Sequence, residues 1–212
     1  MPRRAYVSSV RTAAAAEKRD RVLEAAAKAL REDASIARFS LEGVAKAAGV
    51  TRLTVYNQFG SRRGLLEAVF DDIARDGGLH RIADAMTMPD PREALDRLVE
   101  IFCGFWNRDS AVGRLHDAMA TDPEFAEAVL ERNERRRKGL TTLVGRVAGK
   151  SASRRARQDA IDTIFALTSY AMFAMLRPGR SAEDVCRLIQ LASRAALAPL
   201  VADTHRVSSP SS

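Results

Sequence analysis

Two short helical patterns separated by one glycine are the strongest constraint in this sequence. The first follows Ser40, whose hydroxyl can accept a hydrogen bond from an unpaired N–H group at a helix start. Gly49 ends that pattern, Val50 lies in the turn, and Thr51 is suited to cap a second helix that reaches Phe59. Two short helices joined by a tight glycine-containing turn predict a helix-turn-helix.

The second of these helices is expected to expose an unusual set of side chains. If Val55 points inward, Phe59 lies about 40° away on the same face, whereas Leu53 and Asn57 lie about 160° to either side. A helix built only for packing would not be expected to present such a mixed surface on one short segment flanked by basic residues. The outward set is Arg52, Leu53, Thr54, Tyr56 and Asn57.

Each outward group has a use on DNA. Asn57 can hydrogen-bond a base edge, most naturally adenine, and Arg52 can reach guanine or a phosphate, while Leu53 can pack on a thymine methyl group. The hydroxyls and the start of the next helix suit phosphate oxygens. Taken singly, however, an exposed Leu or Asn is ordinary. The candidate DNA-binding residues are Thr51, Arg52, Leu53, Thr54, Tyr56, Asn57, Ser61, Arg62 and Arg63.

The excess positive charge lies in the same part of the chain. The 34 Lys and Arg residues outnumber 27 Asp and Glu residues, which gives a formal net charge of +7. Residues 1–63 hold 13 basic and 6 acidic side chains, and residues 64–212 hold 21 of each. A basic head on a neutral body suggests a head that meets a polyanion. A solvated surface that only confers solubility remains the alternative.

The remainder of the chain predicts an all-α fold of about nine helices. The 12 glycines and 7 prolines are too few for a many-stranded sandwich or barrel. Besides the helices above, expected ones run over about 13–33, 61–75, 90–106, 122–147, 153–176 and 181–202. The expected domains are a flexible basic arm (1–12), a helix-turn-helix domain (13–60), a regulatory and dimerisation body (61–206, with 61–75 as connecting helix) and a flexible tail (207–212).

Other functional classes find little support in the sequence. Cys103 and Cys186 are isolated, without a C-x-x-C pair, so they are expected to be reduced thiols that pack as small hydrophobes rather than a disulfide or redox switch. No histidine has a partner at catalytic or metal-binding spacing, and no phosphate-binding glycine loop is present, so neither an enzyme nor a bound metal or cofactor is expected. No signal peptide or membrane-spanning stretch is found, which favours the cytoplasm.

Residues 40–70, SLEGVAKAAGVTRLTVYNQFGSRRGLLEAVF, resemble the DNA-binding region of the tetracycline-repressor (TetR) family of bacterial regulators. The core of the likeness is Thr54-Val55-Tyr56-x-x-Phe59, followed by Ser61 and the opening of a helix. The resemblance extends as far as about Arg75 and includes the amphipathic first helix.

The resemblance implies a function and also has two departures. Leu53 stands where the family often has a small residue, and Gln58 stands where it often has His, so the family's base preference does not carry over. The family implies a homodimer whose heads bind a palindromic operator and whose body binds a small molecule, so that an apolar or aromatic ligand releases the repressor. The rival hypotheses are a helical adaptor or anionic membrane-surface protein and a helical enzyme.

Two further surfaces are expected in the body. Aromatic and Met side chains that converge between helices suit an apolar or aromatic ligand, although core packing is the alternative for each. The pocket candidates are Phe102, Phe105, Trp106, His116, Met119, Phe125, Phe165 and Tyr170, with His116, Asn107 or Asp162 as polar contacts. Helix 153–176 has two apolar faces and therefore needs two partners. The dimer-interface candidates are Leu167, Ala171, Ala174, Leu188, Ala192 and Ala196, with Val185 and Ile189 beside them.

Overall fold

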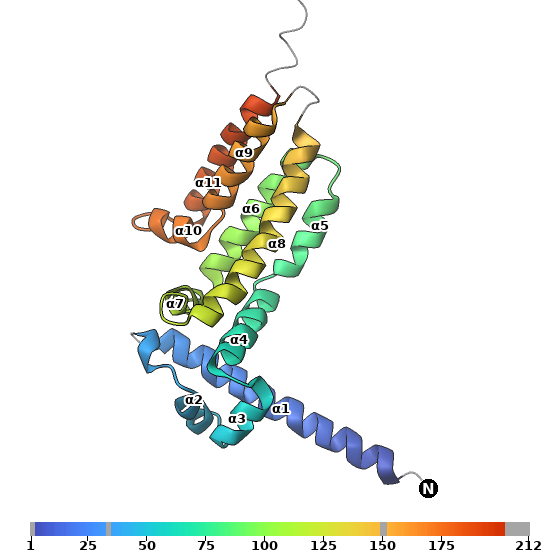
Figure 1. The fold of residues 1–212 in the computed structure, drawn as a ribbon, viewed down its shortest axis with the longest axis vertical. Coiled ribbons are helices and arrows are strands. Elements are labelled where there is room, and N and C mark those ends of the chain that lie inside the picture. Colours follow the sequence, from blue (N-terminus) through green and yellow to red (C-terminus); the bar gives the residue numbers. More distant parts are fainter. Residues whose placement is uncertain (1–2, 33–34, 149–151, 202–212) are drawn as a thin grey trace, which may run out of the picture. The chain divides into compact units, whose positions relative to one another are not determined.

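The computed structural model describes residues 3–32, 35–148 and 152–201, with side chains from residue 12 onward. Within these ranges the chain forms eleven α-helices and three short 3-10 segments, without a β-strand (Figure 1). The all-α prediction is therefore confirmed. The helix count exceeds the expected number of about nine because two short helices, Ile82–Thr87 and Ala111–Ala118, lie outside the expected ranges and because one expected helix is broken.

The chain divides into two compact units. The head unit holds Met1–Ile73 and Asp109–Val129, and the body unit holds Ala74–Arg108 and Leu130–Ser212. The boundaries expected from the sequence, 13–60 and 61–206, differ from this division. Residues 61–73 and 109–129 belong with the head unit, because they pack against it through contacts that are distant in sequence.

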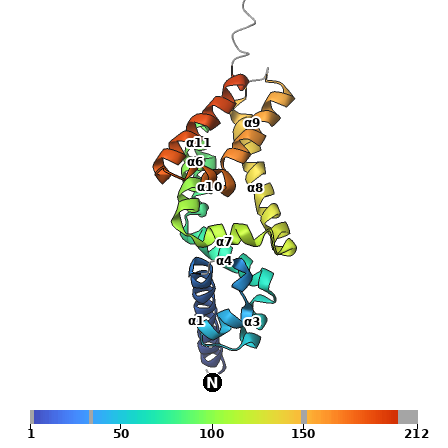
Figure 2. The same ribbon diagram turned by 90° about the vertical axis from the view of Figure 1, so that its left-hand side faces the viewer.

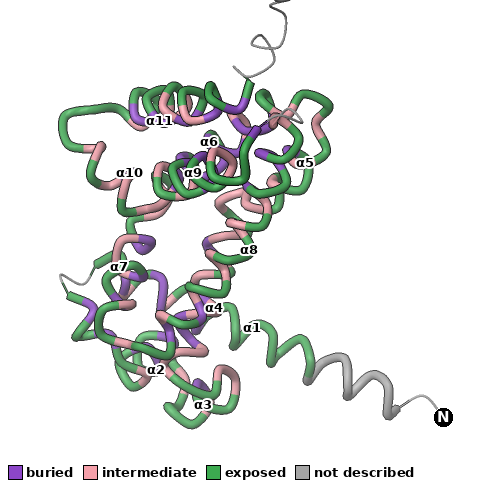
Figure 3. Tube along the Cα trace, turned by 45° about the horizontal axis from the view of Figure 1, so that its top comes forward, coloured by how far each residue is buried: buried purple, intermediate pink, exposed green. Residues whose placement is uncertain are grey.

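The head unit consists of α1 and the helix-turn-helix, together with the helices that pack on them. Its core contains Val22, Ala26 and Leu30 from the first helix and Leu65 and Leu66 from the fourth, all of them buried. Buried stretches of the chain are purple in Figure 3. The expected flexible arm is replaced by helix from residue 3, whereas the expected tail lies outside the described residues. The elements are α1 (Arg3–Glu32), η1 (Ile36–Arg38), α2 (Leu41–Ala47), α3 (Arg52–Phe59), most of α4 (Arg62–Asp76), α7 (Ala111–Ala118) and the start of α8 (Pro123–Val147).

The helix-turn-helix has the caps that its sequence predicts. Ser40 Oγ accepts the Gly43 N–H at 3.1 Å at the start of α2, and Thr51 Oγ1 accepts the Thr54 N–H at 3.1 Å at the start of α3. Gly49 between the two helices has φ 65°, a left-handed conformation in which a Cβ atom would be strained. The local sequence therefore fixes where both helices begin and how the chain turns between them.

The body unit is a bundle around α6. Helix α11 packs on both α6 and α9, and both ribbon views show these helices side by side (Figure 1 and Figure 2). Its core includes Leu98, Phe102, Leu140, Leu143 and Ile164. The elements are η2 (Leu79–Arg81), α5 (Ile82–Thr87), α6 (Pro91–Arg108), the remainder of α8, α9 (Arg154–Leu167), α10 (Tyr170–Leu176), α11 (Ala182–Leu197) and η3 (Ala198–Leu200).

The predicted single helix over 153–176 is wrong. It breaks between α9 and α10, which are bent by 60° relative to each other. Thr168 Oγ1 donates back to the Ile164 carbonyl at 2.8 Å, and Ser169 Oγ accepts the Met172 N–H at 3.2 Å as the cap of α10. Hydroxyl side chains next to each other thus end one helix and start another.

The described residues contain no single helix that is long and apolar enough to cross a membrane. Helices α9 and α10 satisfy the length and composition only as a bent pair.

Candidate DNA-binding site

Helix α3 exposes four of the five side chains that the sequence predicts on its outer face, and the fifth, Thr54, is half-buried. Val55 is fully buried (0% exposed), whereas Leu53 is 65% and Tyr56 57% exposed. Arg52 and Asn57 are also exposed. An exposed leucine and tyrosine beside an arginine and an asparagine form a surface that can contact both apolar and polar groups of a base pair.

The ends of α3 are held by contacts within the head unit. At the start, the hydroxyls of Thr51 and Thr54 are hydrogen-bonded to each other at 2.9 Å, so they fix the first turn of the helix. At the end, the Arg19 guanidinium lies over the Phe59 ring at 4.5 Å, and Gln58 Nε2 donates to the Ala15 carbonyl at 3.5 Å. Gln58 therefore faces α1 rather than the outer surface of α3.

In the expected phosphate clamp at the start of α4, Arg62 is held by acceptors within the head unit. Arg62 donates through Nη1 to Asp122 Oδ2 at 2.8 Å, through Nη2 to the Ile36 carbonyl at 3.3 Å, and through Nε to the Phe39 carbonyl at 3.4 Å. A guanidinium with three internal acceptors is a structural anchor, because a phosphate would have to displace them.

The other two members of the expected clamp are also engaged. Arg63 Nε donates to Glu67 Oε1 at 2.7 Å, and this hydrogen bond raises the pKa of Arg63 above its usual value. Ser61 Oγ accepts the Gly64 N–H at 3.0 Å, as a helix-capping residue does. Ser61 is nevertheless exposed, so its contact with a phosphate stays a prediction.

A second ion pair fastens α7 to α1 within the head unit. Arg31 donates to both oxygens of Asp109, with Nη2 to Oδ2 at 2.6 Å and Nε to Oδ1 at 3.0 Å. Burial alone would raise the pKa of Asp109, but the hydrogen bonds from Arg31 and from the Ala111 N–H hold it below its usual value. Both this pair and Arg62 with Asp122 join residues that are far apart in sequence, so no local pattern could have indicated them.

The candidates for a ligand pocket divide between the two units. In the body unit the Phe105 and Trp106 ring centroids are 4.6 Å apart, and Trp106 meets Tyr170 edge-on at 5.8 Å and Phe102 at 6.1 Å. Phe165 belongs to the same core cluster as Phe102 and Trp106. The structure does not place the other three candidates in that cluster: they belong to the head unit, with Phe125 fully buried, Met119 half-buried and His116 exposed.

Arg136 of α8 is the residue that sequence reasoning missed in this aromatic cluster. Its guanidinium carbon lies 4.1 Å from the Phe165 ring centroid and 5.6 Å from that of Phe102, and Nη1 donates to the Thr168 carbonyl at 2.7 Å. Burial, with the charge of Arg137 as a second cause, lowers the pKa of Arg136 to about 10. Its Nε is buried and has no acceptor among the described residues. The sequence predicted His116, Asn107 or Asp162 as the polar contacts of the ligand. It gave no sign that Arg136 is half-buried among the aromatic rings.

The dimer-interface candidates lie at the surface of the body unit. Ala171 and Leu188 are exposed, and Leu167, Ala174, Ala192 and Ala196 are half-buried or exposed. Val185 and Ile189, which were expected at the same interface, are instead buried in the body's own core. Two exposed side chains outside the interface candidates, Met175 and Leu191, extend the apolar surface.

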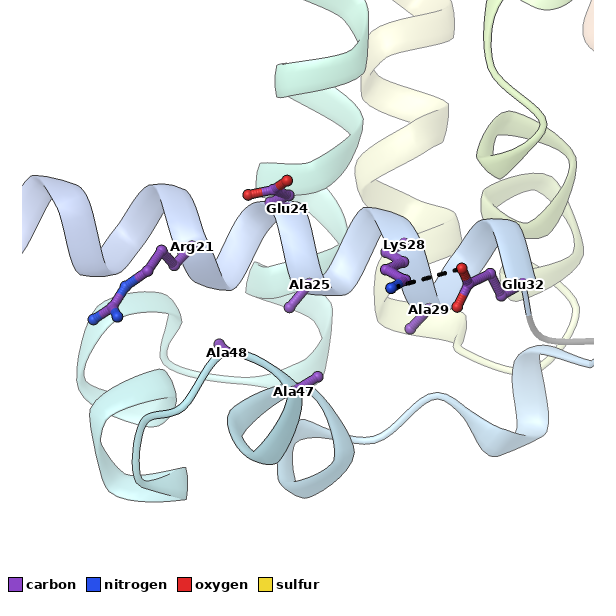
Figure 4. A pocket seen from close by; sticks show the side chains of 8 residues that line it. All are labelled: Arg21, Glu24, Ala25, Lys28, Ala29, Glu32, Ala47 and Ala48. Carbon is purple, nitrogen blue, oxygen red and sulfur yellow. Dashed lines mark ion pairs between the residues drawn. The ribbon is translucent and has the colours of Figure 1, made fainter.

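Neither of two recesses in the surface contains a predicted pocket residue. One, of about 520 Å³, lies in the head unit and is bordered by charged side chains, among which Lys28 and Glu32 form an ion pair (Figure 4). The other, of about 400 Å³, lies in the body unit between α8 and α9. The head recess is lined by Arg21, Glu24, Ala25, Lys28, Ala29, Glu32, Ala47 and Ala48, and the body recess by Thr141, Val144, Gly145, Ala152, Arg154, Arg157, Gln158 and Ile161.

The anchoring role of Arg62 can be measured against its neighbour. We expect Arg62→Met to lower the free energy of unfolding by about 2 kcal/mol, because Asp122 and two backbone carbonyls lose a charged donor. Arg63→Met removes only an ion pair between side chains one helical turn apart and should cost clearly less. Urea unfolding followed by circular dichroism at one protein concentration compares the two variants. Equal losses would contradict the anchor.

Comparisons of sequence find relatives of the head unit, and comparisons of structure find relatives of the whole fold. Residues 23–69 match the sequence model of bacterial regulatory proteins of the tetR family. The HTH-type transcriptional regulator EthR of Mycolicibacterium smegmatis is 31% identical over 112 residues, which are 51% of each chain, so this chain spans about half the length of that curated relative.

Solved structures resemble the chain over most of its length. A Rhodococcus protein described as a TetR-family transcriptional regulator has a TM-score of 0.68 at 20% identity, covering 85% of this chain and 99% of its own. The TetR-family regulator PfmR of Thermus thermophilus has a TM-score of 0.61 at 22% identity, covering 82% and 97%. Residues 23–69 therefore carry a sequence match to the tetR family of bacterial regulatory proteins, and the fold of the chain is similar to that of solved structures described as regulators of this family.

Proposed function

We propose that the protein is a dimeric, sequence-specific DNA-binding transcriptional regulator. The observation that carries this proposal is the exposed face of α3, which presents Arg52, Leu53, Tyr56 and Asn57 on a short capped helix. The excess positive charge of residues 1–63 and the tetR-family match over 23–69 support the same conclusion. The name of the relative EthR, a transcriptional regulator, agrees with it.

Helix α3 enters the major groove in this proposal. Asn57 hydrogen-bonds a base edge, Arg52 reaches guanine or a phosphate, and Leu53 packs on a thymine methyl group. Tyr56 donates to a phosphate oxygen and so fixes the register of the helix on the duplex. Thr51 and Thr54 act by holding the first turn of the helix, since their hydroxyls already bond to each other. Arg62 takes no part in phosphate binding.

Recognition by α3 can be tested with a pair of arginine variants. A duplex selected from a random library serves as the probe. We expect Arg52→Ala to weaken binding to this duplex by about tenfold or more, in line with the loss of a base or phosphate contact. Arg155→Ala removes the same charge from an exposed position in the body unit and should leave the affinity unchanged.

The outcome of the selection also discriminates between functional classes. Affinity for the selected duplex should exceed that for a scrambled duplex and should fall steeply as salt is raised. If no duplex is preferred over random competitor, and vesicles of anionic lipid bind equally well, the membrane-surface alternative replaces the regulator.

Dimerisation supplies the spacing that operator binding needs. Two copies of α3 held about 34–36 Å apart enter successive major grooves on one face of the DNA. We propose that the end of α9, α10 and α11 of two subunits meet through Leu167, Ala171, Ala174, Leu188, Ala192 and Ala196. The apolar exposure of Leu188 and Leu191 on α11 supports this surface, because such side chains gain by being covered.

A charge placed in that surface is expected to produce monomers. In Ala192→Glu an unpaired carboxylate would be buried between subunits, so sedimentation should show the monomer and binding to a palindromic duplex should be lost. Ala83→Glu adds the same charge at an exposed position on α5 and should leave the dimer intact. Dimers of Ala192→Glu that persist at micromolar concentration would exclude this interface.

We propose that an aromatic or apolar ligand with an acidic group releases the regulator from DNA. The aromatic cluster of Phe102, Trp106, Phe165 and Tyr170 supplies the apolar contacts. Arg136 supplies a half-buried positive charge with a buried Nε that has no acceptor among the described residues. Because coupling is reciprocal, a ligand that prefers the DNA-free state must lower DNA affinity by the factor by which DNA lowers its own.

The ligand class can be tested through tryptophan fluorescence, because Trp106 is the sole tryptophan of the chain. A panel of aromatic carboxylates and their matching amides serves as probes. We expect acids that bind to change the Trp106 emission and to bind more tightly than their amides. Arg136→Met should remove about tenfold or more of that preference, in line with the loss of a charged hydrogen bond. Equal affinity for acids and amides would contradict a role of Arg136 in binding.

A further inference from the structure

The two cysteines of the chain, which were expected to be isolated, lie together in the body unit. Cys103 on α6 and Cys186 on α11 belong to one apolar cluster with Val99, Phe173 and Ile189. Helices α6 and α11 pack along each other, which brings together two residues that are distant in sequence. Both cysteines are free thiols in this structure. The expectation of free thiols is confirmed, and the structure adds that the two residues lie in one cluster, with Cys186 half-buried rather than buried.

The two thiols differ in their access to solvent. Cys103 is buried, at 4% exposure, whereas Cys186 is half-buried. Cys186 also lies about 200° around α11 from Leu188 and about 120° from Ala192, so it is away from the centre of the proposed dimer interface. A reagent from solution can therefore reach Cys186 more readily than the buried Cys103.

A hydrogen bond between the two thiols makes them chemically unequal. This hydrogen bond, followed by burial, raises the pKa of the Cys103 thiol. The same hydrogen bond lowers the pKa of Cys186, against the opposing effects of burial and of the carboxylates of Glu100 and Asp96. Cys186 is thus the thiol that more readily becomes a thiolate, which is the reactive form, and Cys103 is its proton donor.

We propose that Cys103 and Cys186 form a redox-active dithiol that hydroperoxides oxidise to an intramolecular disulfide between α6 and α11. The Cys186 sulfur attacks the peroxide, the O–O bond breaks, and an alcohol (water, when the oxidant is hydrogen peroxide) leaves after taking up a proton. Cys186 is then a sulfenic acid. The Cys103 sulfur attacks it, the S–O bond breaks, and the hydroxide leaves as water with the Cys103 proton. Two thiols lose two electrons in total, and one hydroperoxide gains them.

The arrangement favours this reversible reaction over further oxidation. A sulfenic acid at Cys186 has a thiol in contact with it, so condensation competes with a second attack by peroxide. The product links α6 to α11 and is reopened by a dithiol reductant. The oxidation itself does not depend on the proposed DNA-binding function, whereas any effect of the link on DNA affinity would rest on that function.

Mass spectrometry of the full-length protein tests the proposal. The reduced protein is treated with a small excess of hydrogen peroxide or cumene hydroperoxide and is then alkylated with iodoacetamide. We expect the intact mass to fall by two hydrogen atoms and both cysteines to escape alkylation. A peptide map without reductant should contain a linked pair that includes Cys103 and Cys186, and dithiothreitol should restore both thiols.

Two single variants separate the roles of the thiols. Cys103→Ser should accumulate a sulfenic acid at Cys186 that dimedone traps, and Cys186→Ser should slow oxidation of Cys103 by about tenfold or more, because the reactive thiolate is gone. Circular dichroism confirms that each variant is folded, and the wild-type mass measurement does not depend on either variant. The proposal is overturned if both wild-type thiols remain alkylatable after oxidation, or if only disulfides between subunits form. These results would leave the DNA-binding proposal untouched, since that is measured on the reduced protein.

Discussion

The burial of Val55 beneath a helix capped by Thr51 determines what α3 can present to another molecule. With Val55 fully buried, the geometry of the helix places Leu53 and Asn57 on the outside. The hydrogen bond from the Thr54 N–H to Thr51 Oγ1 fixes the residue at which the helix begins. A shift of the helix start by one residue would rotate the whole exposed set by about 100°. Every assignment of a base or phosphate contact to α3 therefore depends on this cap and this buried valine.

Two arginines at similar positions in the head unit have different roles, because only one of them contacts residues that are distant in sequence. Arg52 and Arg62 both stand at the first residue of a helix in the basic head, and the sequence suggests a nucleic-acid contact for each. Arg52 is exposed, whereas Arg62 bonds to Asp122 and to two backbone carbonyls of the segment before α2. The charge pattern thus locates a basic region but does not decide which of its charges are available. Whether Arg62 is available depends on Asp122, which is far away in sequence.

The parts of the fold that could be predicted are those determined within a few residues. The caps at Ser40, Thr51 and Ser181 have local signatures, and the structure confirms them. The inward face of α3 follows from helical periodicity alone. In contrast, the grouping of residues 109–129 with the head unit and the pairing of Cys103 with Cys186 depend on tertiary packing. Spacing along the chain contains no information on such pairs, which is why the sequence alone did not indicate that the two thiols lie in one cluster.

The break between α9 and α10 explains why the aromatic cluster was only partly predicted. In an unbroken helix the Thr168 carbonyl would accept the N–H group four residues later. Because α9 ends at Leu167, that carbonyl instead accepts Trp106 Nε1 at 3.1 Å and Arg136 Nη1 at 2.7 Å. The aromatic residues could be named from composition, but the guanidinium among them could not, since its acceptor exists only where the helix ends. The unbroken helix and the omission of Arg136 were therefore one error, and the hydroxyls of Thr168 and Ser169 are its cause.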